Sequence, residues 1–339
     1  NCDACFSYMG NDKLYEASRR GVISEETYRE ILKYKERLQK NGVPVIYNLR
    51  HVRKIFQIRR KEQELFFGAQ REALYYQFEI PKKSGGKRTI EAPCDRLKKI
   101  QRWIKDEIID SFYPSEYATG FRKGISIVHI GKELVINFDL KDFFPSVTYA
   151  EILKLFVYMG YRLDVAHLLT KICTNSENVL PQGSPASPSI SNLVLLKLDK
   201  RLSSLAKTIS CSYSRYADDI TFSGNKSIKS IVPLVIQIIT DEGYTVNENK
   251  IRLQYANQRQ EVTGLTVNTN LAVSKNITDE IEKAIYFCNK FGVSSHMKHI
   301  ACDKHFYREH LYGIAYFIMM VDPQKGKIYL KELNDLNWV

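Results

Sequence analysis

Three aspartates at the ends of predicted strands constrain this chain of 339 residues more than any other feature. The apolar run Leu134–Phe138 predicts a buried strand, and that strand ends at Asp139. Residues 211–223 predict a hairpin that carries Asp218 and Asp219 at its tip. An acidic pair in a turn is usually structural or solvated. Adjacent carboxylates beside a third on the next strand, however, supply the hard oxygen ligands that Mg²⁺ prefers, so the pattern predicts a two-metal site for phosphoryl transfer.

Helical and strand patterns are mixed along the chain, and hairpins are central to it. This order predicts an α+β fold and argues against a doubly wound parallel sheet. Ser24 is the expected N-cap of a helix that ends at Asn41-Gly42. The other expected elements are a basic hairpin over residues 75–91, helices over 96–111, 149–172, 190–206 and 227–242, a strand-turn-strand over 262–273, and a mostly helical, basic end from residue 279.

The charge balance favours an anionic partner. Lys and Arg number 50 against 38 Asp and Glu, which gives a formal net charge of +12. Nucleic acid is the first candidate for the partner, and a basic surface kept for solubility is the alternative. No apolar run reaches 18 residues and no N-terminal signal pattern is present, so we expect a cytoplasmic protein without a membrane span. The seven scattered cysteines suit reduced thiols better than a disulfide framework.

Three motifs carry a resemblance to reverse transcriptases: FDLKDFFPSV at 138–147, LPQGSPASP at 180–188 and YADD at 216–219. The similarity is closer still to the bacterial retron reverse transcriptases. It rests on YSRYADDITFS at 213–223, QEVTGLTVN at 260–268, NGVPVIYNL at 41–49, KRTIEAP at 87–93 and RLKKIQRWI at 96–104. It covers about residues 37–320. One departure is that the family's Asn-Ala-x-x-His element keeps only His129 here.

The resemblance implies a right-hand polymerase with an N-terminal helical extension. The expected parts are the extension over residues 1–42, fingers over 43–136, a palm with finger insertions over 137–272, and a thumb over 273–339. The role of residues 1–36, which look additional, is left open between a docking surface for RNA or a partner and a cap on the fingers.

The same resemblance implies catalytic roles. Asp139, Asp218 and the backbone carbonyl of Leu140 would bind two Mg²⁺ ions, and Asp219 would complete or support the site. Lys250 matches the lysine that protonates pyrophosphate as a general acid, with an ordinary surface lysine as the alternative.

Five further residues match the positions that bind the incoming nucleotide. Phe144 corresponds to the steric gate against a ribose 2′-OH, although one ring of Phe143-Phe144 would simply pack in the core. Gln182 and Gly183 would line the nucleotide site; the alternative for Gly183 is a plain turn glycine. Lys87 and Arg88 suit the triphosphate, and a solvated basic turn is the alternative.

Cationic residues on two predicted helical regions are the expected contacts with nucleic acid. The thumb pattern of Lys and Arg interleaved with aromatic residues fits a surface that follows a duplex backbone, although charge runs on helices are usually solvated. The candidate contacts are Arg96, Lys98, Lys290, Lys298 and Lys304.

The implied reaction is RNA-directed DNA synthesis from deoxynucleoside triphosphates. The template would be a cognate structured non-coding RNA, primed from the 2′-OH of an internal guanosine, and the product a branched RNA–DNA hybrid called multicopy single-stranded DNA (msDNA). The system would serve in antiphage defence with a separate effector protein, and the oligomeric state is open. The alternatives are a non-retron defence-associated reverse transcriptase that makes unbranched DNA, and an RNA-binding scaffold without catalysis.

A zinc site is the weaker of the two metal-site hypotheses. Cys2 and Cys5 have half the spacing of such a site, and a second group recurs every three residues. That spacing is also what one helical face gives. The second group is His296, His299, Cys302 and His305.

Overall fold

The computed structural model describes residues 15–16, 18–81, 86–121, 130–300 and 304–338, apart from the side chains of residues 81, 88 and 304–306. The first long helix, α3 (Glu25–Lys40), begins where the Ser24 hydroxyl accepts a hydrogen bond from Thr27 N, and its C-cap is Asn41. The predicted bounds of this helix are confirmed. Its Tyr34 and Leu38 side chains belong to the main hydrophobic core, so the extension is packed onto the body of the protein.

Short helices precede the first hairpin. They are α4 (Leu49–Ile55), η1 (Arg60–Glu62), α5 (Gln63–Phe67) and η2 (Ala69–Leu74). The hairpin pairs β1 (Tyr75–Pro81) with β2 (Lys87–Pro93) in antiparallel register, Tyr75 opposite Pro93. Helix α6 (Asp95–Glu107) and η3 (Ile109–Ser111) follow. The hairpin is therefore where the sequence predicts it, whereas the helix predicted over residues 96–111 ends at Glu107 and its last residues form the 3-10 turn η3.

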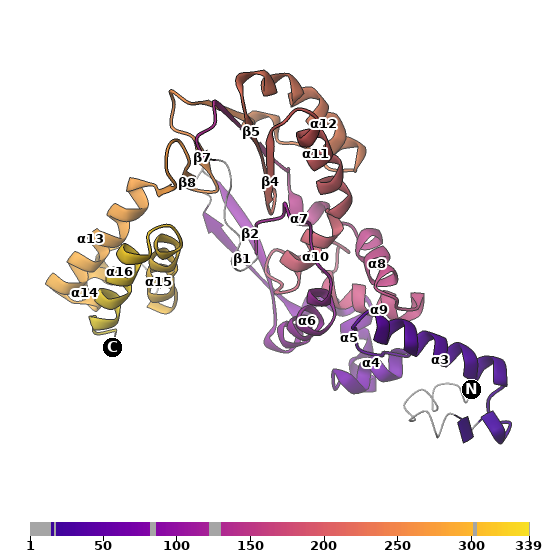
Figure 1. Cartoon of the computed structure of the whole chain (residues 1–339). Helices are drawn as coiled ribbons and strands as arrows, with labels where there is room; N and C mark the ends of the chain where they lie inside the picture. The colour runs from indigo at the N-terminus through magenta and orange to yellow at the C-terminus, as the bar shows by residue number, and fades with distance from the viewer. Residues whose placement is uncertain (1–14, 17, 82–85, 122–129, 301–303, 339) are drawn as a thin grey trace.

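A four-stranded antiparallel sheet in the order β4-β5-β3-β6 forms the centre of the molecule (Figure 1). Its strands are β3 (Leu134–Asp139), β4 (Ser212–Tyr216), β5 (Asp219–Gly224) and β6 (Arg252–Tyr255). The helices on this part of the chain are α7 (Phe143–Ser146), α8 (Tyr149–Tyr158), α9 (Leu163–Cys173), α10 (Ser187–Val194), α11 (Leu196–Thr208) and α12 (Val232–Asp241), with the 3-10 turns η4 (Lys226–Ile231) and η5 (Glu248–Lys250).

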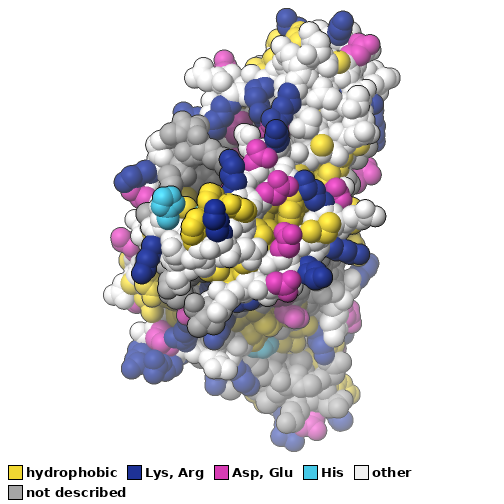
Figure 2. All heavy atoms as spheres, turned by 90° about the vertical axis from the view of Figure 1, so that its left-hand side faces the viewer, with side chains coloured by type: hydrophobic (Ala, Val, Ile, Leu, Met, Phe, Trp, Pro, Cys, Tyr) yellow, Lys and Arg dark blue, Asp and Glu magenta, His cyan; other side chains and the backbone are white. Residues whose placement is uncertain are grey.

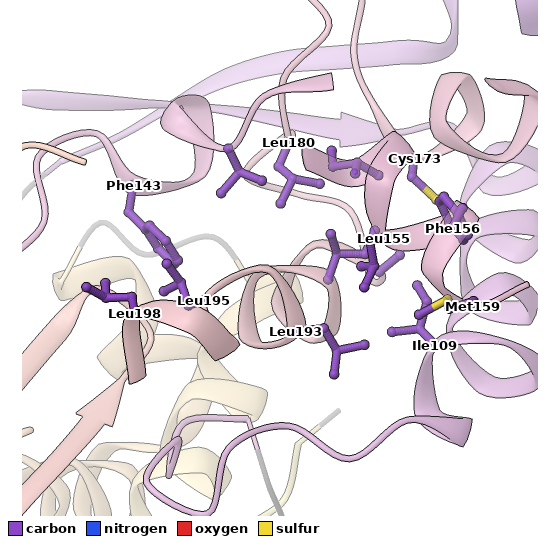
Figure 3. Close-up of a cluster of buried hydrophobic side chains, with 14 of the residues drawn as sticks. Ile109, Phe143, Leu155, Phe156, Met159, Cys173, Leu180, Leu193, Leu195 and Leu198 are labelled. Carbon is purple, nitrogen blue, oxygen red and sulfur yellow. The ribbon is translucent and has the colours of Figure 1, made fainter. Parts of the chain in front are cut away.

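Hydrophobic side chains from these helices interdigitate beside the sheet. Figure 3 shows Leu155 of α8 and Met159, the C-cap of that helix, meeting Leu193 of α10 and Ile109, all of them buried. The first five residues of β3 are buried, as the apolar run predicts. This packing makes the sheet a rigid platform, because close-packed interiors leave side chains little freedom.

The helical pattern predicted over residues 149–172 is confirmed, but the segment is not one continuous helix. It is two helices, because Gly160 has φ +106°, a left-handed backbone that ends α8 before α9 begins. The helix predicted over 190–206 is likewise divided at Leu195. The segment predicted as a helix over 227–242 starts as η4 and becomes α-helical only from Val232, where Pro233 suits the first turn.

A small sheet and a helical end complete the chain. The small sheet has the order β7-β8-β9, with strands Glu261–Val262, Leu265–Thr266 and Ala272–Val273. The last helices are α13 (Lys275–Phe291), α14 (Val293–His299), α15 (Lys304–Val321) and α16 (Pro323–Asp335). They share a separate hydrophobic core that includes Leu311 and Leu333. The α+β expectation is confirmed, and the exact domain boundaries stay predictions.

Candidate active site

The central sheet brings the three predicted aspartates together. In the register of β3 and β5, Asp139 lies directly opposite Asp219. Tyr216 pairs with Asp219 across the β4–β5 hairpin, which leaves Ala217 and Asp218 as its two-residue tip. The Leu140 amide donates to the Asp218 carbonyl at 3.1 Å and ties the end of β3 to this tip. Residues nearly 80 positions apart in the sequence thus meet at one end of the sheet.

The carboxylates repel one another in a partly buried site. Burial, followed by the charges of Asp218 and Asp139, raises the pKa of Asp219 to about 6, against the smaller opposing effect of Arg252 and Lys250. Lys250 Nζ lies 3.0 Å from Asp139 Oδ2. The predicted general acid is therefore in the site. A concentration of negative charge with one ammonium group is an arrangement that a bound cation would stabilise.

The donor chemistry fits Mg²⁺, although the carboxylates do not form a closed cage. In the described part of the chain no three His, Cys, Asp or Glu side chains converge closely enough to hold a metal ion by themselves. Mg²⁺ usually takes one or two protein carboxylates and completes its shell with water and substrate phosphates. Asp139, Asp218 and Asp219 provide hard oxygens of that kind, so the metal expectation keeps its chemical basis and stays a prediction.

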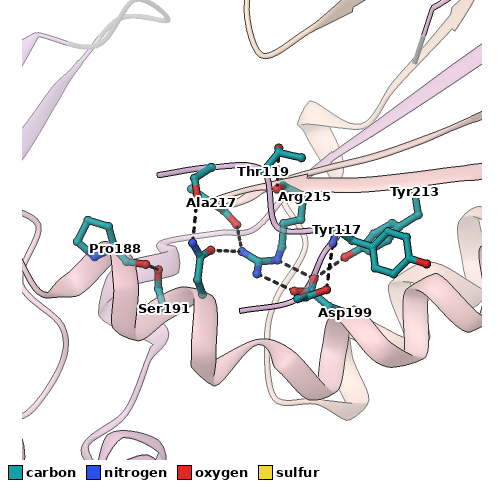
Figure 4. Close-up of polar contacts among 11 residues, drawn as sticks. Tyr117, Thr119, Pro188, Ser191, Asp199, Tyr213, Arg215 and Ala217 are labelled. Atoms are coloured by element: carbon teal, nitrogen blue, oxygen red, sulfur yellow. Dashed lines mark hydrogen bonds and ion pairs between the residues drawn. The ribbon is translucent and has the colours of Figure 1, made fainter. Parts of the chain in front are cut away.

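A buried network that the sequence reading missed holds the hairpin tip (Figure 4). Arg215 and Asp199 are both fully buried, and Asp199 accepts from Arg215 Nε at 2.8 Å and from Nη2 at 2.7 Å. Tyr213 OH also donates to Asp199, at 2.7 Å. Arg215 Nη1 donates to the Asn192 side chain at 3.1 Å and to the Ala217 carbonyl at 3.0 Å. The guanidinium thus links helices α10 and α11 to the tip that carries Asp218.

The tip needs such support because its backbone is unusual. Ala217 has φ +54°, a conformation that costs a non-glycine residue about 1–2 kcal/mol. Gly120 packs against it so closely that a Cβ there would lie 2.8 Å from Ala217 N. One signal for this network was present in the sequence: Tyr213 and Arg215 share a strand face that is otherwise buried, and a charge on such a face requires a partner.

Of the predicted nucleotide-site residues, Phe144 lies beside a core ring, whereas Gln182 and Gly183 lie on a loop that meets strand β2. Phe143 is buried and contributes the core ring that the sequence reading allowed for, whereas Phe144 is half-buried. Gln182 has a buried Oε1 without a hydrogen-bond partner in the described structure. Such an acceptor suits a ligand donor. A Cβ on Gly183 would lie 2.4 Å from the Glu91 carbonyl, so this glycine is needed where the loop meets β2.

The basic hairpin is only partly available to a phosphate. Lys87 Nζ forms an ion pair with Glu79 Oε2 at 2.6 Å across β1 and β2. Arg88 lies in β2, and its side chain is outside the described part of the structure. The triphosphate role of both residues stays a prediction, and Lys87 would have to exchange its carboxylate partner for a phosphate.

The candidate nucleic-acid contacts also differ in how they are engaged. Arg96 donates to Glu62 Oε1 at 2.6 Å and to the Gln57 carbonyl at 2.8 Å, so its guanidinium is occupied within the fingers region. Lys98 and Lys298 are exposed. Lys304 begins α15, and its side chain lies outside the described part. All four remain predictions as nucleic-acid contacts.

Lys290 lies in an exposed aromatic cluster on α13. Its Nζ is 3.1 Å from Tyr286 OH and lies over the rings of Tyr286 and Phe291. Figure 2 shows the side of the molecule on which helices α13–α16 lie. Hydrophobic side chains gather there among cationic and acidic ones. Exposed rings with a cation between them form a surface suited to nucleic acid.

The zinc hypothesis gains no support from the described residues. His296 Nε2 lies 2.8 Å from Tyr307 OH, and its ring stacks on Phe287, so packing accounts for it. His299 is exposed. Cys2, Cys5, Cys302 and His129, with the side chain of His305, lie outside the described residues.

Two expectations about the chain's setting can be compared with the structure. Cys94, Cys173, Cys211 and Cys288, the cysteines within the described segments, are free thiols, as predicted. Among the helices that the structure describes, none combines the length and the apolar character needed to cross a membrane.

Known proteins similar to this chain are reverse transcriptases, which agrees with the acidic site described above. Residues 80–268 match the family model for reverse transcriptases (RNA-dependent DNA polymerases). The retron Ec86 reverse transcriptase of Escherichia coli is 32% identical over 311 residues, covering 88% of this chain and 92% of that protein. The retron Mx65 and Mx162 reverse transcriptases of Myxococcus xanthus are 35% and 34% identical over 75% and 77% of this chain. The chain spans 62% and 61% of the length of those two proteins.

Proposed function

Because the chain belongs to the family of retron reverse transcriptases, we propose that it is an RNA-directed DNA polymerase that copies a cognate structured RNA. The family match and the α+β order of elements give it the right-hand polymerase fold. The observation that carries the proposed activity is the placement of Asp139 opposite Asp219, with Asp218 on the adjoining tip. A scaffold that only bound RNA would gain nothing from gathering three repelling carboxylates.

The residues of the site divide the work of nucleotide addition. Two Mg²⁺ ions, held by Asp139, Asp218 and the Leu140 carbonyl with Asp219 in support, would activate the primer hydroxyl and neutralise phosphate charge. Lys250, next to Asp139, holds a proton that pyrophosphate can take as it leaves.

The incoming deoxynucleotide would be selected and held by residues on α7, on the loop over residues 180–188 and on the β1–β2 hairpin. Phe144 would exclude a ribose 2′-OH, and the unpaired Gln182 Oε1 would accept a hydrogen bond from the nucleotide. Lys87 and Arg88 would approach the triphosphate.

Primer extension tests this activity directly. Asp218→Asn combined with Asp219→Asn should abolish DNA synthesis on an RNA template with deoxynucleotides and Mg²⁺, while RNA binding persists. Asp106→Asn combined with Asp110→Asn is the matched control, because it removes two exposed carboxylates that both pair with Lys105. Continued synthesis by the first variant would overturn the assignment of the aspartates. RNA binding without synthesis by the unaltered protein would favour the scaffold.

The finer proposal concerns the product and its setting. We propose that synthesis is primed from the 2′-OH of an internal guanosine, that the product is msDNA, and that the system acts in bacterial antiphage defence with a separate effector. The support is the similarity to retron enzymes.

Nucleic acid purified with the protein from cells that carry its native locus distinguishes the products. Short DNA joined to RNA and shifted by debranching enzyme is the expected result. Unbranched DNA would instead place the protein among other defence-associated reverse transcriptases.

A further inference from the structure

A basic groove lies between the N-terminal helix α3 and the short helices that follow it. The groove has a volume of about 1040 Å³ and is lined by residues from α3, from α4 and η1, and from the start of α9. Six of its lining side chains are cationic and only Glu30 is acidic. The cations are Lys33, Arg37, Arg50, Arg53, Arg60 and Arg162.

Within the part of the chain that the structure describes, four of these six cations form no ion pair with a carboxylate: Lys33, Arg37, Arg53 and Arg60. Arg162 pairs with Asp164 at 3.0 Å. Arg37 Nε donates to the Gly160 carbonyl at 2.9 Å and Arg53 Nε to the Ile58 carbonyl at 3.2 Å, and neutral carbonyls orient a guanidinium without cancelling its charge. Lys33 of α3 and Arg60 of η1 are both exposed. The groove therefore attracts an anion.

The walls of the groove are fixed before any ligand arrives. Tyr34 OH donates to the Ile46 carbonyl at 2.7 Å, and Asn41 Nδ2 donates to the Met159 carbonyl at 3.0 Å. Leu38, on the same helix, is fully buried. A rigid wall spends little entropy on binding, which is the advantage of a preorganised site.

The aromatic residues of the groove are not free to stack on bases. Tyr34 is buried beneath the guanidinium groups of Arg37 and Arg162, at 5.3 and 5.9 Å from its ring centre. Tyr47 already stacks on His51 at 5.7 Å. Recognition in the groove would therefore go through phosphates and would not depend on base sequence.

The groove and the three aspartates lie in different parts of the molecule. Figure 1 shows α3 and α4 on the opposite side of the central sheet from helices α13–α16. We propose that this groove binds the phosphate backbone of RNA at a distance from the active site, so that the protein holds its template RNA at a second place while the aspartates copy it. The identity of the partner as RNA rests on the proposed function.

Salt dependence of binding to a uridine homopolymer tests the groove. The test variant is Lys33→Gln combined with Arg60→Gln. The matched control is Lys40→Gln combined with Lys61→Gln, which removes the same charge from exposed positions of the same two elements outside the groove lining. The logarithm of the RNA-binding constant falls as the logarithm of the salt concentration rises. Loss of two phosphate contacts should make this negative slope shallower by about 1.4–1.8 in the test variant alone. Its affinity at low salt should fall at least tenfold.

Two readouts keep this inference separate from the proposed function. Extension of a short primer–template by the Lys33/Arg60 variant should equal that of the unaltered protein, because the variant leaves the active site intact. Equal salt slopes in the test and control variants would overturn the groove. If the test variant has the shallower salt slope but the unaltered protein never extends a primer, RNA binding by the groove is supported and the proposed polymerase activity is overturned.

Discussion

The buried ion pair behind the hairpin that carries Asp218 and Asp219 gives the sharpest prediction of stability. Asp199→Asn keeps the size of the side chain but removes its negative charge. It also replaces one of the two carboxylate oxygens by an amide nitrogen that faces the Arg215 guanidinium. The carboxylate accepts three hydrogen bonds of 2.7–2.8 Å, from Tyr213 and Arg215. Removing one partner of such a pair leaves an uncompensated buried charge, which costs about 3–5 kcal/mol. That is a large part of the stability of an ordinary domain.

The surface offers a matched control. Asp241 makes the same kind of contact, with Oδ2 2.9 Å from Arg201 Nη2, but both side chains are more than one third exposed. Exposed pairs contribute about 0–1 kcal/mol, so Asp241→Asn should hardly change the free energy of unfolding.

Urea unfolding followed by tryptophan fluorescence measures the difference. In a Trp338→Phe background, Trp103 is the remaining tryptophan of the chain and packs edge-on against Phe56 at 5.2 Å. It reports on the core to which α6 belongs. An Asp199→Asn cost no greater than that of Asp241→Asn would refute the argument.

A double variant separates stability from positioning. Asp199→Leu combined with Arg215→Met replaces the pair by apolar groups and should cost much less stability than Asp199→Asn. It also removes the donor to the Ala217 carbonyl, which is now 3.0 Å from Arg215 Nη1. DNA synthesis should therefore fall at least tenfold in a protein that is still folded. Full synthesis by that variant would show that the guanidinium does not position the tip.

Three further outcomes follow from the site. Asp219→Asn should raise the free energy of unfolding at pH 7 in EDTA by about 1–3 kcal/mol, as measured by urea unfolding. The reason is that the pKa of this carboxyl is about 6 in the folded protein and 3.8 in the unfolded chain, so its ionisation makes the folded protein less stable as the pH rises between those values. The gain should therefore vanish below pH 4. Phe144→Ala should reduce discrimination against ribonucleotides at least tenfold in single-nucleotide extension, and unchanged discrimination would reject the gate. Gly183→Ala should cost about 1–3 kcal/mol through its clash with the Glu91 carbonyl, whereas Gly313→Ala, with open space around it, should be neutral or stabilising.

Local pattern was sufficient to predict the strands and the hairpin that carry the three aspartates. The apolar run before Asp139 and the short strands around Asp218 and Asp219 each have a period that a sequence displays directly. Helix α3 was predictable for the same reason, since its cap and its sided pattern lie within one stretch of chain. The interruption after α8 was missed because a single left-handed residue, Gly160, decides it.

Contacts between distant segments were decided only by the tertiary structure. Arg215 finds Asp199 because β4 packs against α11, and Gly183 meets the backbone of β2 some 90 residues away in the chain. The basic groove exists only because residues of α3, α4 and η1 come together around it. Propensity and periodicity determine which elements form, but the pairing of side chains depends on how those elements pack, and packing is a property of the whole chain.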